Sequence, residues 1–197
     1  MTPPVGVILA GGRATRMGGG DKALLDLGGR PMLGYVIDRL RPQVAAMAVN
    51  ANGDPARFGR FELPVLRDPV DGFAGPLAGV LAGMGWAVQQ GATHLVTVAG
   101  DTPFFPADLV ARLVAAAGNA PIALAATPDG LQPTFGLWQV SLRDELALAL
   151  AAGSRKVASW AEAAGAVRVA FGDASAFFNV NTPEDLAVAR ARLSGEA

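Results

Sequence analysis

The sequence has no cysteine, one histidine and few aromatic residues, and these shortages exclude several classes of protein. Without cysteine the chain can form neither a disulfide scaffold nor a metal site built on thiolates. Its apolar runs are shorter than the roughly 20 residues of a membrane span, so we expect no contact with a membrane. Acidic and basic residues nearly balance, at a net charge of −1. This balance argues against a basic protein that binds nucleic acid non-specifically.

The first residues do not have the pattern of a secretory signal peptide. In MTPPVGVILAGG no basic segment precedes the short apolar run, and prolines interrupt it. A chain without cysteine also suits a reducing compartment. We therefore expect a cytoplasmic protein.

The sequence is rich in apolar residues, at 51%, and in glycine, at 25 of 197 residues. The apolar share is too high for a disordered chain, and the length suits one domain, which we predict to span residues 1–197. Short apolar runs alternate with amphipathic stretches. The predicted strands are 5–9, 44–50, 63–66, 94–99, 121–126, 134–138 and 167–171. The predicted helices are 31–40, 76–90, 106–117, 141–152 with Ser141 as N-cap, 154–164, and one that opens with Thr182 as N-cap.

The predicted strands are apolar along their whole length rather than at alternate positions. Together with the strand–helix alternation, this pattern is typical of an α/β protein whose mainly parallel central sheet is covered by helices on both faces. Ligands of such sheets bind beyond the carboxyl ends of the strands. Three strand ends are therefore of interest: the segment 9–22, Asn50 and the segment 99–103.

The segment from Leu9 to Lys22 is the strongest functional signal. Glycines directly after a strand let the backbone approach a ligand and turn its N–H groups toward phosphate. Arg13, Arg16 and Lys22 add three cations, in a chain with only 16 Lys and Arg. The P-loop pattern fails because alanine follows Lys22, and the G-x-G-x-x-G of dinucleotide sites is missing. The alternative is a connection with solvated charges, but a long loop in a compact domain is usually functional.

The same segment matches the opening of nucleotidyltransferases that join a nucleotide to a phosphorylated acceptor, L-A-(G/A)-G-x-x-x-R-M-G followed by a lysine. Further motifs occur in order: Gly-Gly-Gly-Asp-Lys (18–22), Val-Asn-Ala-Asn (49–52), Gly-Pro-Leu-Ala-Gly (75–79), Gly-Asp-Thr-Pro (100–103), Gln-Pro-Thr (132–134) and Asn-Val-Asn-Thr-Pro-Glu-Asp-Leu (179–186). Together they closely resemble the molybdenum cofactor guanylyltransferase family over nearly the whole chain. The resemblance implies a three-layer, Rossmann-like nucleotidyltransferase fold.

The resemblance also implies a reaction. A phosphate oxygen of molybdopterin would attack the α-phosphorus of GTP, release pyrophosphate and form the molybdopterin guanine dinucleotide cofactor. Positioning and cations do most of the catalysis in such a transfer. Lys22 would neutralise the phosphates, and Arg16 would hold the β- and γ-phosphates of the leaving group. Asp101, at a strand end, would bind Mg²⁺, or Mn²⁺ in its place; without the resemblance, Asp101 also fits a turn.

Several residues are expected to contact the two substrates. Guanine presents both donors and acceptors, which backbone amides and the Asn50 side chain can match. The resemblance carries Asp68 over as a nucleotide-binding residue and places the asparagines before the last helix near the acceptor. From the residues alone, Asn50 and Asp68 also fit turns, and residues 179–181 fit a helix entrance. The expected contacts are Leu9, Ala10, Gly11, Gly12, Lys22, Asn50, Asp68, Asp101, Asn179 and Asn181.

Two positions depart from the family pattern. Gly100 stands where cysteine is common, and Gln132 stands where histidine or arginine is usual, which leaves the pterin contacts near Gln132 open. Two other functions stay open as well: a cytidylyltransferase for the same pterin, and a non-catalytic nucleotide-binding regulator on the same fold. The pair Lys22 and Asp101 disfavours the regulator, because a protein that only binds nucleotide has less need of a metal carboxylate. Transfer of so unstable a cofactor suggests transient docking to molybdenum cofactor synthesis proteins and acceptor enzymes.

Overall fold

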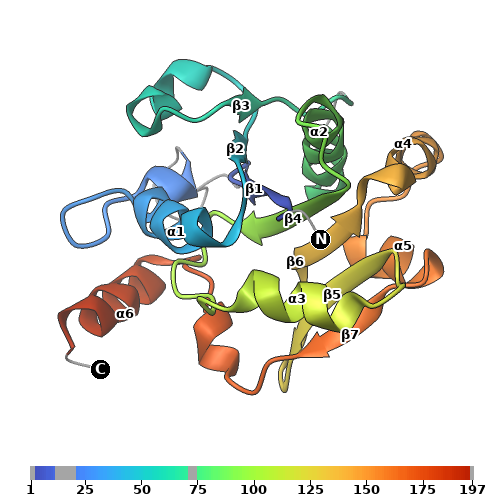
Figure 1. Ribbon diagram of the computed structural model, residues 1–197. Helices are drawn as coiled ribbons and strands as arrows, with labels where there is room; N and C mark the ends of the chain where they lie inside the picture. The colour runs from blue at the N-terminus through green and yellow to red at the C-terminus, as the bar shows by residue number, and fades with distance from the viewer. Residues whose placement is uncertain (1–2, 12–20, 71–74, 196–197) are drawn as a thin grey trace.

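The computed structural model describes residues 3–11, 21–70 and 75–195 of the chain. Within them, one seven-stranded sheet has the order β3-β2-β1-β4-β6-β5-β7 (Figure 1). The strands are Val5–Leu9 (β1), Met47–Asn50 (β2), Val65–Leu66 (β3), His94–Ala99 (β4), Ile122–Thr127 (β5), Gly130–Gln139 (β6) and Val167–Ala170 (β7). Four strand pairs are parallel, and β6 runs antiparallel to β4 and β5. The prediction of a mainly parallel sheet is confirmed.

Strand β6 is twice as long as the predicted strand 134–138. It forms a hairpin with β5, in which Thr127 pairs with Gly130 across Pro128 and Asp129. Gly130 has a φ of +131°, a conformation that L side chains rarely adopt, so glycine suits this turn. The residues that follow the turn pair with β5 as far as Gln132, and the register then shifts before Gly136, so that Thr134 lies in the irregular part of β6.

Helices cover both faces of the sheet. The helices are Met32–Leu40 (α1), Pro76–Gln89 (α2), Leu109–Ala117 (α3), Arg143–Ala151 (α4), Val157–Ala163 (α5) and Pro183–Ser194 (α6), with 3₁₀ segments Lys22–Leu24 (η1), Arg41–Gln43 (η2), Pro55–Phe61 (η3), Val140–Leu142 (η4) and Ala174–Phe177 (η5). Helices α1 and α3 share one apolar core with the sheet, and α2, α4 and α5 share the other (Figure 1). This arrangement confirms the three-layer α/β fold. No helix of the described residues is both long and apolar enough to cross a membrane.

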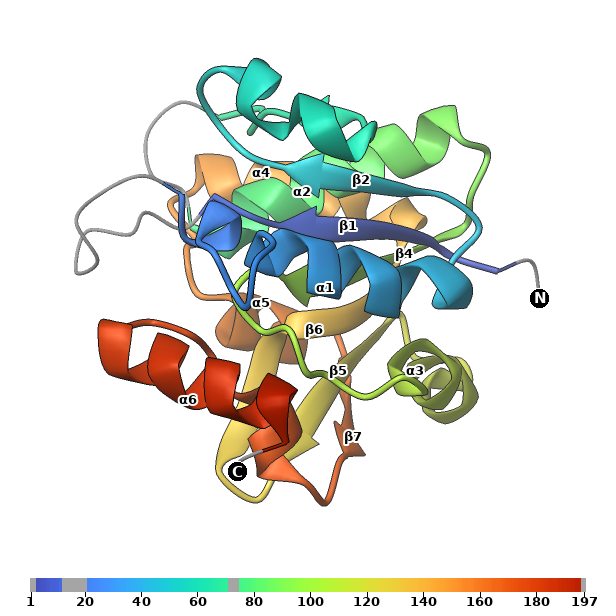
Figure 2. The same ribbon diagram turned by 90° about the vertical axis from the view of Figure 1, so that its left-hand side faces the viewer.

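The starts of α4 and α6 test two predicted N-caps. For α6 the prediction is confirmed, because Thr182 and Asp185 form a reciprocal capping box. For α4 it is wrong: Ser141 lies inside η4, and Leu142 occupies the N-cap position. Val140, buried at the start of η4, anchors a 3₁₀ turn ahead of the helix. Figure 2 shows α6 beside the α1 layer, where Val180 and Ala189 join a third, smaller apolar cluster with Leu27 and Met32.

The strand register brings three predicted strand ends to one level. Leu9, the last residue of β1, pairs with Asn50 on β2 and with Ala99 on β4. The chain leaves β1 toward β2 on one side and returns as β4 on the other side. The carboxyl ends of β1 and β4 thus form a topological switch point, the usual place for a ligand in an open α/β sheet.

Candidate functional site

A cavity of about 460 Å³ opens at this switch point. Its lining comes from the ends of the central strands and from the segments that follow them. The lining residues are Leu9, Ala10, Gly11, Asp21, Lys22, Ala23, Asn50, Asn52, Gly53, Arg57, Asp68, Gly75, Pro76, Ala99, Gly100, Asp101 and Thr134. The structure therefore brings seven of the expected contact residues to one cavity. Gly12 and Arg16 lie outside the described residues.

One wall of the cavity is a cluster of two asparagines around a carboxylate. Asn50 Nδ2 donates to Asp68 Oδ1 at 2.9 Å and to the Leu66 carbonyl at 3.2 Å. Asn52 Nδ2 donates to Asp68 Oδ2 at 2.7 Å, and its Oδ1 accepts from the Asp68 N–H at 3.0 Å. These bonds fix the orientation of both amides, because each Nδ2 must face a carboxylate oxygen. The wall thus presents donors and acceptors in fixed places.

Another wall of the cavity combines Lys22 and Asp101. Lys22 opens η1, and Asp101 follows the last residues of β4. Lys22 Nζ lies 3.7 Å from Asp101 Oδ2, and the two side chains are 18% and 24% exposed. Burial raises the pKa of the Asp101 carboxyl above its ordinary value, and the nearby Lys22 charge opposes that rise. A carboxylate in this environment is only partly compensated by protein and can bind a further cation.

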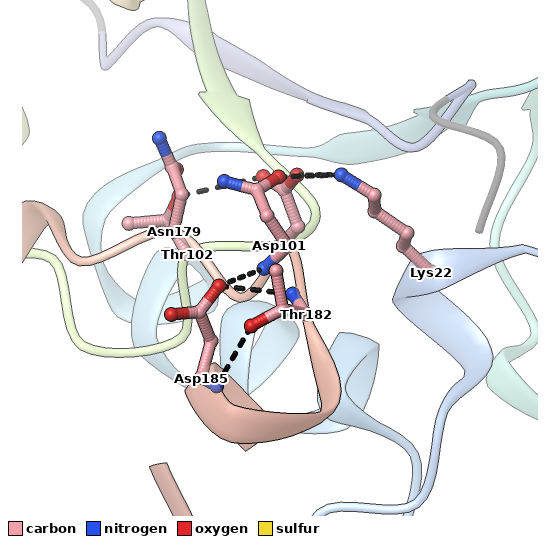
Figure 3. A network of polar contacts seen from close by, with 7 residues as sticks. Lys22, Asp101, Thr102, Asn179, Thr182 and Asp185 are labelled. Carbon is pink, nitrogen blue, oxygen red and sulfur yellow. Dashed lines mark hydrogen bonds and ion pairs between the residues drawn. The ribbon is translucent and has the colours of Figure 1, made fainter. Parts of the chain in front are cut away.

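The segment before α6 closes this wall from the other end of the chain (Figure 3). Lys22 Nζ donates to Asn181 Oδ1 at 2.5 Å, and the buried Thr102 hydroxyl donates to Asn179 Oδ1. Between them the Val180 N–H donates to the Asp101 carbonyl at 2.9 Å. Asn179 and Asn181 do not line the cavity, but Asn181 bonds the lining residue Lys22, and Asn179 bonds Thr102, the neighbour of the lining residue Asp101.

The capping box of α6 fixes Asn181 in turn. Asp185 Oδ2 accepts from the N–H groups of Asn181 and Thr182, each at 2.9 Å, and the Asp185 N–H donates to Thr182 Oγ1 at 3.1 Å (Figure 3). The backbone bond from Asn181 is the main cause that lowers the pKa of Asp185 below its ordinary value. A chain of contacts therefore runs from the helix cap through Asn181 to Lys22.

Some cavity residues were not expected from the sequence. Asn52 and Asp21 stand within the motifs 49–52 and 18–22, so their positions carried a signal that was not assigned to them. Thr102 does not line the cavity, but it bonds Asn179 and likewise belongs to the motif 100–103. Arg57 had no signal, because it belongs to η3, a segment that the sequence pattern does not predict.

The donor set decides which metal fits. Within the described residues, no group of three or more His, Cys, Asp or Glu side chains could hold an ion by itself. Asp101 instead offers a single carboxylate that lines the cavity. Mg²⁺ commonly binds through one or two protein carboxylates plus substrate phosphates and water. The residues present therefore fit a magnesium ion that is held jointly with a nucleotide.

Comparison with known proteins gives the family. Residues 6–167 match the MobA-like NTP transferase domain. A protein from Cereibacter sphaeroides named molybdenum cofactor guanylyltransferase is 51% identical over 192 residues, covering 98% of both chains. One of the same name from Mesorhizobium japonicum is 49% identical over 197 residues, covering 95% of this chain and 94% of the other. The chain belongs to the MobA-like NTP transferase domain family.

Solved structures of this type agree with the fold. Molybdopterin-guanine dinucleotide biosynthesis protein A from Archaeoglobus fulgidus superposes with a TM-score of 0.77 at 24% identity, over 97% of this chain and 99% of that one. A 2-C-methyl-D-erythritol 4-phosphate cytidylyltransferase from Thermus thermophilus gives 0.71 at 22% identity, over 98% and 100%. At such identities the likeness shows the nucleotidyltransferase fold alone. Residues 179–186 lie beyond the part of the chain that matches the family domain.

Proposed function

We propose that the protein transfers GMP from GTP to molybdopterin, with or without bound molybdenum, and releases pyrophosphate to form the molybdopterin guanine dinucleotide cofactor. The observation that carries this proposal is that Lys22, Asp101, Asn50 and Asp68 line one cavity. The sequence supports it, because the chain is 51% identical to a protein named molybdenum cofactor guanylyltransferase. One wall suits phosphates and the other suits a nucleoside. The reaction needs both.

In this reaction a phosphate oxygen of the acceptor forms a bond to the α-phosphorus of GTP, while the bond from that phosphorus to the bridging oxygen of pyrophosphate breaks. Both reactants are anions, so the protein must first offset their repulsion. Lys22 places a positive charge beside the phosphates, and Arg16 would hold the departing pyrophosphate. The backbone at Leu9, Ala10, Gly11 and Gly12 would approach the nucleotide closely.

We place Mg²⁺, or Mn²⁺ in its stead, at the Asp101 carboxylate. When bound, such an ion neutralises phosphate oxygens and stabilises the charge of the leaving group. Support comes from the raised pKa of Asp101, since burial leaves the carboxylate short of positive charge. Thr102 and Asn179 would hold the turn that carries Asp101, and Asn181 would hold Lys22 in reach of the phosphates.

Guanine would be read against the wall of Asn50, Asn52 and Asp68. Because the amides are held by Asp68, they cannot rotate to suit a base with the opposite pattern of donors and acceptors. A site built on such hydrogen bonds discriminates strongly between bases. The same logic would let a changed wall select cytosine, which is why a cytidylyltransferase remains the nearest competing enzyme.

The direct test is pyrophosphate release from GTP, CTP and ATP, each with Mg²⁺ and molybdopterin. We expect release with GTP and little with the other two. Preference for CTP would convert the assignment to the cytidylyltransferase. No release with any nucleotide, combined with tight nucleotide binding, would favour the non-catalytic regulator.

The setting of the reaction is part of the proposal. We infer that it takes place in the cytoplasm, which agrees with a chain that contains no cysteine. We also infer that the protein docks transiently with molybdenum cofactor synthesis proteins and acceptor enzymes. Co-purification with an acceptor apoenzyme, in the presence and absence of GTP, would test this docking.

A further inference from the structure

Arg57 connects two segments of the cavity wall, at Asp21 and at Asn52, through one guanidinium group. It lies on η3, the 3₁₀ segment between β2 and β3. Its Nε donates to Asp21 Oδ2, and one terminal nitrogen lies 3.4 Å from Asp21 Oδ1. The same nitrogen donates to the Asn52 carbonyl, and the other donates to the Asp54 carbonyl. A planar group with five donors suits such simultaneous contacts, which the single ammonium of lysine cannot reproduce.

The residues held by Arg57 are the neighbours of groups that face the substrate. Asp21 precedes Lys22 directly in the chain. Asn52 is bonded in both directions to Asp68. Arg57 thus links the wall that contains Lys22 to the wall that contains Asn52 and Asp68. Arg57 and Asp21 are 36 positions apart in the sequence.

The ion pair between Arg57 and Asp21 is more shielded from solvent than a salt bridge on the protein surface. The side chains of Arg57 and Asp21 are 28% and 19% exposed, and the Arg57 guanidinium also lies 4.7 Å from the centroid of the Phe58 ring. Phe58 is buried in the core beneath η3. Solvent screens such a pair less than an exposed one, and the ring limits the movement of the guanidinium.

We propose that Arg57 is a positioning residue, which locks the Lys22 wall against the Asn52–Asp68 wall so that phosphates and nucleoside are held at a fixed separation. This proposal rests on the proposed function for its catalytic consequence. Because Asp21 already neutralises Arg57, the arginine acts through its neighbours rather than as a free cation for the triphosphate.

The kinetic test compares Arg57→Ala, Arg57→Lys and Asp21→Ala with Arg60→Ala, a control on an exposed arginine of the same 3₁₀ segment. For Arg57→Ala we expect kcat/KM with GTP to fall by about tenfold to a hundredfold, since small misplacements at a reacting centre have effects of this size. Arg57→Lys should not rescue the activity, and Asp21→Ala combined with Arg57→Ala should be no worse than Arg57→Ala alone. Arg60→Ala should match the wild type.

Other kinetic outcomes would overturn the proposal. Near-complete rescue by Arg57→Lys would mean that the charge acts directly on the phosphates. An increase in activity for Asp21→Ala would mean the same, because the pair would then restrain a substrate-binding arginine. An equal loss in Arg60→Ala would point to a general effect of η3 on the fold.

A second measurement needs no turnover. The chain has only two lysines, Lys22 and Lys156, so the rate at which trinitrobenzenesulfonate modifies each can be followed separately by peptide mass spectrometry. If Arg57 holds the Lys22 wall, Arg57→Ala and Arg57→Lys should accelerate modification of Lys22 by about tenfold, the shift expected when one charged hydrogen bond is lost. Modification of the exposed Lys156 should not change.

The two measurements separate failure of this proposal from failure of the proposed function. If the wild type released no pyrophosphate but Lys22 became more reactive in the Arg57 variants, the proposed function would fall and the positioning role would stand. If the wild type were active and neither kcat/KM nor Lys22 reactivity changed in Arg57→Ala, the positioning role would fall alone.

Discussion

Helix α2 approaches the nucleoside wall so closely at Gly79 that a methyl group does not fit. A Cβ on Gly79 would lie 2.3 Å from Asn50 Oδ1, 2.7 Å from Leu9 Cδ2 and 2.9 Å from Asn50 Cγ. Side chains in van der Waals contact stay more than 3 Å apart, so Asn50 or the helix must move. Because Asn50 donates to Asp68, its displacement would also disturb the wall proposed to bind guanine.

The magnitude follows from two opposing effects. Replacing glycine by alanine inside a helix stabilises it by about 1 kcal/mol, while overpacking a filled site costs about 1–3 kcal/mol. Gly85 lies on the same helix and has no atom within 4 Å of an added Cβ, so Gly85→Ala receives the gain alone. We expect Gly85→Ala to raise the free energy of unfolding by about 1 kcal/mol. The free energy of unfolding of Gly79→Ala should be lower than that of Gly85→Ala by about 1–3 kcal/mol.

Urea unfolding of both variants measures this difference, and calorimetric titration with GTP measures the effect on the wall. Gly79→Ala should bind GTP about tenfold more weakly, as expected when a hydrogen bond to a charged group is displaced, while Gly85→Ala should bind like the wild type. Asn50→Ala removes the side chain that meets the methyl group, so the stability cost of Gly79→Ala should shrink in that background. Equal stability and equal GTP affinity of Gly79→Ala and Gly85→Ala would refute the steric argument.

Three further variants test Asp101, Lys22 and the Asp185 cap of helix α6. Asp101→Asn should lower kcat by at least about a hundredfold, because several kcal/mol of charge stabilisation are lost with the metal; wild-type turnover would exclude Asp101 as the metal ligand. Lys22→Ala should weaken GTP binding with little change in the free energy of unfolding, as titration and urea unfolding would show. Asp185→Ala should cost about 1 kcal/mol of stability at neutral pH through loss of the capping box, against a few tenths for Glu184→Ala, which affects only the helix dipole. Since backbone N–H groups lower the pKa of Asp185, its contribution is complete above the ordinary value of 3.8 and is lost as the pH falls through its folded value, so unfolding curves of Asp185→Ala and wild type should converge in acid.

The sequence predicts the fold because each local signal agrees with the sheet. The strand at residues 5–9 is observed with the same bounds, and its last residue, Leu9, lies at the switch point. Continuous apolar strands indicate burial on both faces, and the two cores on either side of the sheet confirm it. The hairpin of β5 and β6 was underestimated, although Pro128-Asp129-Gly130 is a strong turn sequence. This hairpin makes β6 antiparallel to its neighbours, and the hydrophobic periodicity of a strand does not indicate its direction.

Apart from Lys22, which the motif after the first strand identifies, the polar residues of the candidate site could be predicted where a residue type and a strand end coincide. Asn50, Asp68 and Asp101 satisfy that condition, and the structure brings them to one cavity. Arg57 does not satisfy it, because η3 has neither helical nor strand periodicity and its partner Asp21 is distant in sequence. Contacts of this kind depend on how two irregular segments meet after the sheet has formed.

The segment before α6 shows how a local signal can have a distant consequence. Thr182, Pro183 and the acidic first turn mark a helix start in any sequence, and Thr182 is the N-cap as predicted, in a capping box with Asp185. The sequence alone does not reveal that the N–H of Asn181 joins this capping box, nor that the Asn181 side chain accepts from Lys22, 159 positions away. If that link matters, Asp185→Ala should reduce turnover more than its modest loss of stability explains, whereas Glu184→Ala should not. A fall in activity that merely followed the unfolded fraction in both variants would show that the cap serves α6 alone.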